Sequence, residues 1–264
     1  MNKVVFLVIF MIDFMYASST SVQYDVGFSV VGTIAKASMH KVQEDDNYVI
    51  TMQARTVGFV AELTKEREDT YISQGSVVGS VFVPDVLVVK RETDDKEKYT
   101  IYTFDHNKKT IQKETSQIKQ VRSQSLDISE MRIIYSEKEE FSVSSSKNDY
   151  YAKDDIVSLL FNSHYYISSM DAGERKKFHA VGINTEQGEL LISLPTASPV
   201  EDKTLIPASK AFDIVLKKDF FKNGQGILAV SLDEDGFLSQ ATMNNVALYG
   251  DVVGKRVYTQ LVSK

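Results

Sequence analysis

DDIVSLLFNSHYYISSM, residues 154–170, is the stretch that most firmly predicts a helix, in a chain whose other periodic segments alternate like strands. Asp154 and Asp155 suit a first helical turn, where a carboxylate accepts unpaired backbone N–H groups and opposes the positive end of the helix dipole. The apolar side chains that follow recur at helical spacing: Ile156, Val157, Leu159, Leu160, Phe161 and Ile167. Gly173 is a natural stop. We therefore expect the surrounding strands to pack on this apolar face.

Alternating apolar and polar residues predict strands before the helix. Residues 24–30 and 48–54 each place their apolar side chains on one face, and the acidic tip at 44–47 predicts a hairpin between them. Residues 57–63 fit no single period, so a short helix and a loop crossing both stay open. Residues 66–83 indicate another strand pair that turns around Gly75.

The next segments predict further strands. Residues 99–104 carry apolar groups on both faces, and a more polar strand follows to about residue 119. The charged run KRETDDKEK, residues 90–98, is interpreted as a solvated turn. Two short strands, 131–135 and 140–143, are expected before the helix. After it we expect a hairpin and a C-terminal meander at 176–184, 189–194, 212–217, 227–232, 237–244 and 246–261.

Together these elements predict a mainly β fold. The expected architecture is a curved antiparallel sheet or half-barrel, with closure to a full barrel as the alternative, packed on one main helix near 154–170. Residues 20–264 are expected to form a single exported domain. An internal boundary near 195–207 is the alternative, because that segment holds three of the four prolines. Only about 57 residues would follow such a boundary, which favours one domain.

Residues 1–19 predict a signal peptide. Lys3 supplies a positive charge, residues 4–16 are almost wholly apolar, and the small residues Ala17, Ser18 and Ser19 suit a cleavage site. A short membrane anchor is the alternative, but this apolar run is shorter than the ~20 residues that cross a bilayer, and no later run is long enough. The absence of cysteine excludes an acylated lipoprotein anchor and a disulfide framework. We expect export to the periplasm of a Gram-negative bacterium, with an extracellular location as the alternative.

Charge and composition exclude several classes of function. A formal net charge of -6 argues against a nucleic-acid surface, which needs clustered Lys and Arg. The four histidines have no metal-ligand spacing, so we expect neither a metal nor a cofactor: they are His40, His106, His164 and His179. We find no catalytic constellation, and the paired carboxylates at the helix start are explained more simply by capping. The sequence therefore predicts a protein that is not an enzyme.

Aromatic residues form the candidate binding site. Phe161, Tyr165 and Tyr166 widen the apolar face of the helix, while Tyr102 and Phe104 give the central sheet a second apolar face. These five side chains either fill an ordinary core or line a cavity between the sheet and the helix. Such a cavity would take an acyl chain or another apolar ligand.

The order of the segments resembles a known family. YDVGFSVVGTIAKASM, YVITMQARTVGFVAEL, YTIYTFDHNKKTI, DDIVSLLF and GILAVSLDEDGFLSQATMNNVALYGDVVGKR are similar to segments of the exported bacterial family called domain of unknown function 3108. The family is similar in architecture to the half-barrels of periplasmic lipoprotein carriers and lipoprotein-insertion factors. The resemblance implies a curved sheet plugged by helices over an apolar concavity, and therefore a binding role without catalytic residues. This chain departs from the carriers because it predicts one clear helix rather than several.

Three functions are compatible with these expectations. The leading one is a periplasmic or secreted non-enzymatic binding protein for a lipid-like or other apolar ligand. The alternatives are a cell-envelope protein–protein interaction module, and a hydrolase whose site is assembled only by the fold.

Overall fold

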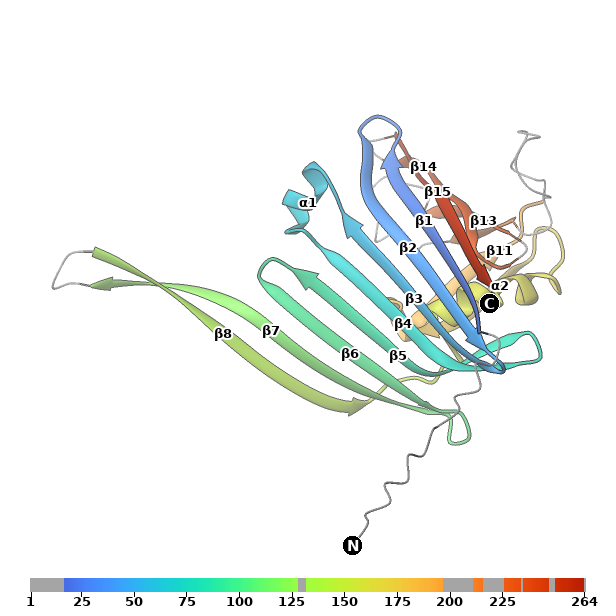
Figure 1. Ribbon diagram of the computed structural model, residues 1–264, viewed down its shortest axis with the longest axis horizontal. Helices are drawn as coiled ribbons and strands as arrows, with labels where there is room; N and C mark the ends of the chain where they lie inside the picture. Colours follow the sequence, from blue (N-terminus) through green and yellow to red (C-terminus); the bar gives the residue numbers. More distant parts are fainter. Residues whose placement is uncertain are drawn as a thin grey trace, which may run out of the picture.

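A computed structural model describes residues 17–127, 132–196, 211–215, 226–233, 235–246 and 250–263. Within these residues the chain forms one large curved sheet with a helix held inside the curve (Figure 1). The mainly β architecture with one main helix is therefore confirmed. The expected signal peptide lies outside the described residues as far as residue 16, and its last three residues begin the first strand.

Fifteen strands make up the sheet in the described residues. They are β1 (Ala17–Phe28), β2 (Gly32–Glu44), β3 (Asn47–Thr56), β4 (Glu68–Val78), β5 (Val81–Thr93), β6 (Lys96–Asp105), β7 (Thr110–Asp127), β8 (Arg132–Lys147), β9 (Asp154–Asp155), β10 (Arg175–Val181), β11 (Glu189–Ser193), β12 (Ala211–Val215), β13 (Ile227–Leu232), β14 (Leu238–Val246) and β15 (Gly250–Ser263). The helices are α1 (Phe59–Thr64) and α2 (Ile156–Ile167), with a single 3₁₀ turn at Glu186–Gly188.

The two ends of the described chain join the sheet at its centre. Strands β1 to β8 run outward in order on one side, strands β15 to β9 run outward on the other, and β1 pairs with β15. Every pair is antiparallel except the short contact between β9 and β10. Strands β8 and β9 lie at the two edges, so the described sheet is unclosed and the alternative of a full barrel was wrong. The β7–β8 ribbon projects beyond the rest of the sheet (Figure 1).

Most predicted strands exist, but one turn was misplaced. The chain does not turn at Gly75, because β4 continues through it and the reversal comes at residues 79–80. At Gly75 the ladder between β4 and β5 changes register, and a Cβ there would lie 2.0 Å from the Val83 carbonyl oxygen. Glycine is required because the two backbones approach too closely for any side chain.

Three other local predictions are resolved by the structure. The segment at 57–63, left open in sequence, contains the short helix α1. The two short strands expected at 131–135 and 140–143 are one long strand, β8, which pairs along β7 over its whole length. The proline-rich segment lies largely outside the described residues, and the strands on either side of it, β11 and β12, pair directly.

Helix α2 is buried on several sides. Val157 and Phe161 pack with residues of the N-terminal strands, such as Tyr48 and Leu87, in the largest core cluster. Ile167 belongs to a second cluster with the C-terminal strands, and Leu159 and Tyr166 to a third around Ala180. Tyr165 is the only exposed residue of α2, because the curved sheet covers most of the helix surface.

Candidate functional site

The N-terminus of α2 is held by a buried carboxylate. Asp155 is fully buried and caps the helix, since its Oδ1 accepts the backbone N–H groups of Val157 at 2.8 Å and Ser158 at 2.7 Å. Its Oδ2 accepts the Ser73 hydroxyl of β4 at 2.6 Å. Ser158 completes a capping box by accepting the Asp155 N–H at 2.9 Å. Burial raises the pKa of Asp155 to about 6, although these hydrogen bonds favour the charged form.

Asp154 and Asn162 fasten the helix to the start of β5. The Asn162 side chain accepts the Phe82 N–H at 2.8 Å and donates to the Phe82 carbonyl at 2.8 Å. It also donates to Asp154 at 2.7 Å, and the Tyr166 hydroxyl donates to the other Asp154 oxygen at 2.9 Å. Burial again raises the pKa of Asp154. All four carboxylate oxygens of the aspartate pair therefore accept protein hydrogen bonds, which indicates a role in docking the helix.

An apolar cavity of about 240 Å³ lies beside α2. Its wall is formed by residues of β1 to β4 in one half of the sheet, by residues of β13 to β15 in the other half, and by Leu160 of the helix. Buried Tyr24 and Met39 belong to its wall, and exposed Gln53 and Ala54 place part of that wall at the surface. The cavity is therefore a pocket between sheet and helix, distinct from the filled core beneath α2 and lined by other residues than the five aromatic residues proposed from the sequence.

Small side chains at matched positions on neighbouring strands create this cavity. Ala37 of β2 lies directly opposite Ala54 of β3, and Ala241 of β14 lies directly opposite Gly254 of β15. All four line the cavity. Each pair lacks the bulk that side chains from two facing strands normally contribute, which leaves space beside Leu160.

Tyr24 contributes to the cavity wall, but its hydroxyl is buried away from the cavity surface. The Tyr24 hydroxyl is buried and has no hydrogen-bond partner in the part of the chain that the structure describes. Arg256, opposite Tyr24 in register, gives its N–H groups to the Leu238 carbonyl and to Asp233. Burial raises the pKa of Tyr24, and the nearby Arg256 charge offsets part of that effect.

Three of the five predicted site residues meet in the largest core cluster, where Phe104 and Phe161 are buried and Tyr102 packs against the cluster, but none of the five lines the apolar cavity. Phe161 lies in filled core between Phe82 and Phe237, with ring centroids 5.5 and 5.1 Å away. Tyr166 is buried against Phe178, and Phe104 is buried beside His106.

The other two predicted residues face different surroundings. Tyr165 is 54% exposed, unlike the other residues of α2. Tyr102 lines a separate, polar pocket. The physical reason is that α2 is covered on several sides, so a broad apolar face on this helix meets several core clusters and not a single cavity.

The cavity residues that the sequence reasoning missed are small or ordinary apolar side chains. The sequence pattern places Leu160 on the apolar face of the helix and Ala54 on the apolar face of its strand, but it does not point to Ala37, Ala241 or Gly254. A usable signal was alanine at an inward-facing strand position, where a bulky residue is the norm. That signal identifies a cavity only when the strand register is known.

Comparison of the chain with models of known families, with curated proteins and with solved structures finds no match. The resemblance to an exported family therefore stays a prediction. Neither helix in the described residues is long and apolar enough to span a bilayer. The same residues contain no group of three or more His, Asp or Glu side chains placed to hold a metal ion.

Proposed function

We propose that the protein is a non-enzymatic binding protein, periplasmic or secreted, that holds a lipid-like or other apolar ligand in the cavity beside α2. The observation that carries this proposal is the cavity itself, which lies between a curved sheet and its covering helix and has almost wholly apolar walls. Such pockets, with few polar groups, are the usual sites for small hydrophobic ligands.

The size of the cavity limits the ligand. A volume of about 240 Å³ exceeds the roughly 150 Å³ at which an engineered apolar cavity holds benzene, and falls below the ~300 Å³ at which drug-sized pockets begin. A short aliphatic chain, or the end of a longer one, fits this space.

A series of straight-chain alcohols tests this proposal. Each buried methylene contributes about 0.8 kcal/mol, so each added carbon should tighten binding about fourfold until the cavity is full. Isothermal titration of the full chain with alcohols from butanol to decanol measures the gain in affinity per added carbon and the chain length at which the gain stops. Native mass spectrometry of gently purified protein shows whether a ligand is retained from the host.

Two matched variants connect the binding to the cavity. Ala37→Leu adds bulk inside the cavity and should abolish the gain with chain length. Ala61→Leu makes the same change on α1, away from the cavity wall, and should leave the gain in affinity with chain length unchanged. Absence of alcohol binding, or equal binding by both variants, would count against a ligand in this cavity.

The interaction-module alternative depends on an exposed strand edge. In the described sheet that edge is β8, where Phe141 and Val143 are exposed. The same strand carries Glu137, Lys138, Glu139 and Glu140, all exposed. Charged residues on an edge strand oppose the addition of another strand. We therefore prefer the cavity as the functional site.

A further inference from the structure

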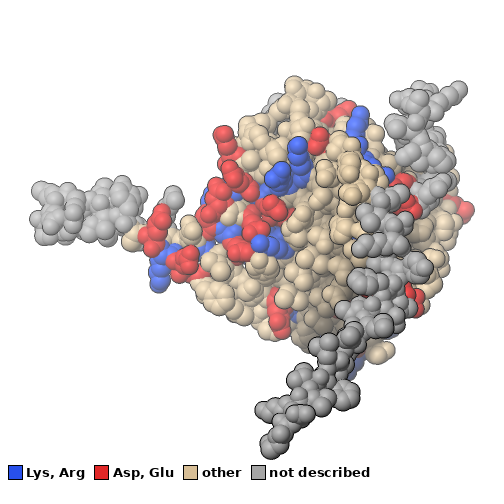
Figure 2. Space-filling model, viewed as in Figure 1, with Lys and Arg blue, Asp and Glu red and all other residues tan. Residues whose placement is uncertain are grey.

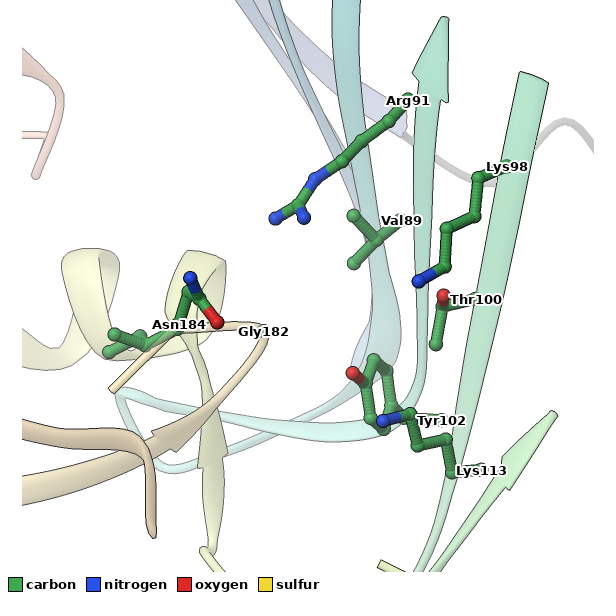
Figure 3. A pocket seen from close by; sticks show the side chains of 9 residues that line it. Val89, Arg91, Lys98, Thr100, Tyr102, Lys113, Gly182 and Asn184 are labelled. Atoms are coloured by element: carbon green, nitrogen blue, oxygen red, sulfur yellow. The ribbon is translucent and has the colours of Figure 1, made fainter. Parts of the chain in front are cut away.

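A second pocket, of about 140 Å³, gathers positive charge on the inner face of the sheet. Arg91 of β5, Lys98 of β6 and Lys113 of β7 line it, together with Thr100 and Tyr102. The turn after β10 bounds it with Gly182, Ile183 and Asn184. Figure 3 shows the Arg91 guanidinium, the Lys98 ammonium and the Tyr102 hydroxyl directed toward the space that Asn184 faces from the other side. No carboxylate belongs to the described wall.

Strand register explains why these cations meet. Arg91 lies directly opposite Lys98, and Lys113 lies directly opposite Tyr102. Lys98 and Tyr102 are four residues apart on β6, so they point to the same face. Three neighbouring strands therefore each place one cation on one surface, although like charges opposite each other destabilise a sheet.

The carboxylates nearest in register already form ion pairs with basic residues outside the pocket. Asp69 lies opposite Arg91 on β4, but Arg67 holds both of its oxygens, with N–O distances of 3.0 and 2.6 Å. Glu92 and Glu97 both pair with Lys90, at 2.7 and 3.1 Å. The pocket wall holds cations and, among the described residues, no carboxylate. On the face of the molecule seen in Figure 2, by comparison, basic and acidic side chains lie intermixed.

The three cations themselves lack anionic partners among the described residues. The Arg91 Nε is buried without a hydrogen-bond partner in that part of the chain. The Lys113 ammonium lies 5.8 Å from the centre of the Tyr102 ring, a contact that leaves its charge uncompensated. Burial lowers the pKa of Lys98, and the charges of Lys96, Lys113 and Arg91 lower it further.

We propose that this pocket binds an anionic group rich in oxygen, a phosphate or a carboxylate, through Arg91, Lys98 and Lys113. A guanidinium provides the forked donor geometry that such groups accept, and the two ammonium groups add charge-assisted hydrogen bonds. The Tyr102 hydroxyl and the Asn184 amide supply neutral donors beside them. The pocket holds roughly five water volumes of ~30 Å³, which suits a group of this size.

The anion has two possible sources. It is either a free ion or the head group of an amphiphile whose chain lies in the apolar cavity. The two sites are neighbours, because Val89 of the charged pocket lies directly opposite Tyr71 of the apolar cavity. Adjacent strands lie about 4.8 Å apart, so the two pockets are close enough for an amphiphile to be one of the sources tested. Only this amphiphile source depends on the function proposed above.

Isothermal titration of the full chain with three probes tests the proposal: inorganic phosphate, hexyl phosphate and hexanol. Binding of inorganic phosphate that weakens as salt rises supports the anion site. Hexyl phosphate that binds at least tenfold more tightly than inorganic phosphate identifies an amphiphile, and equal affinities identify a free anion. Failure of both phosphates to bind at millimolar concentration overturns the proposal. Failure of hexanol alone rejects the apolar-ligand function and leaves the anion site standing.

Charge-removing variants locate the binding. Arg91→Gln and Lys98→Gln should each weaken phosphate binding at least tenfold, whereas Lys36→Gln, an exposed control on β2, should not. Without phosphate, both pocket variants should melt at a higher temperature than the parent, because each removes repulsion between like charges. That rise also verifies folding. Unchanged phosphate affinity in both folded variants overturns the assignment.

Discussion

Replacing Asp155 by Asn should remove a large part of the pH dependence of folding. In the folded chain burial raises the pKa of this carboxyl to about 6, whereas an unfolded aspartate titrates near ~3.9. Between these pH values the folded chain holds a proton that the unfolded chain does not. The free energy of unfolding therefore falls as pH rises from about 4 to about 6, and changes little above that.

The magnitude follows from the same two pKa values. Full protonation contributes about 3 kcal/mol relative to the ionised state, and about 1.4 kcal/mol of that is present at pH 5. Asn retains an oxygen for the two N–H groups of the helix start, so the cap survives. Its amide faces Ser73, whose hydroxyl can turn to the Tyr48 hydroxyl at 3.0 Å. The variant should therefore fold, but its free energy of unfolding should lack the increase at low pH that protonation of Asp155 gives the parent.

Urea denaturation at pH 5, 6, 7 and 8 measures this effect. The free energy of unfolding of Asp155→Asn relative to the parent should fall by about 1.4 kcal/mol between pH 7.5 and pH 5. Asp95→Asn is a control of opposite sign, because hydrogen bonds from Lys65 and Thr93 lower the pKa of exposed Asp95. Removing that carboxylate should cost more at neutral than at acidic pH. If the free energies of unfolding of the parent and of Asp155→Asn changed equally with pH, the reasoning would be refuted.

Five further substitutions, arranged as three tests, probe the packing. Phe161→Ala should cost about 3–5 kcal/mol in urea denaturation, and exposed Tyr165→Ala less than about 1 kcal/mol; similar costs would contradict the assignment of Phe161 to core. Asn162→Leu should cost at least about 2 kcal/mol, since it leaves a buried N–H and a buried carbonyl of β5 unpaired; a neutral result would contradict that docking role. Gly75→Ala should prevent folding or lower the melting temperature sharply, whereas Gly254→Ala, with its nearest contact at 3.7 Å, should fold normally.

Local chemistry could be predicted from the sequence alone. The helix start at the aspartate pair, most of the strands, and the mainly β class all follow from capping and from the period of the side chains, which involve residues only a few positions apart. The structure refines the helix to Ile156–Ile167, because Asp154 and Asp155 have an extended backbone and pair with β10. The turn predicted at Gly75 was wrong, because the glycine there is required by the close approach of two backbones within the sheet and not by a reversal of the chain.

Only the tertiary structure decided what surrounds the helix and where space remains. The cavity depends on Ala37 meeting Ala54 and on Ala241 meeting Gly254, and these pairings join residues that lie far along the chain from the helix they face. The charged pocket depends on the same kind of information. Arg91 and Lys98 belong to a run interpreted as a solvated turn, and their position inside the curve follows from the register of β5 and β6. A one-residue slip would turn both side chains to the opposite face, so a sequence pattern cannot specify the site without the register.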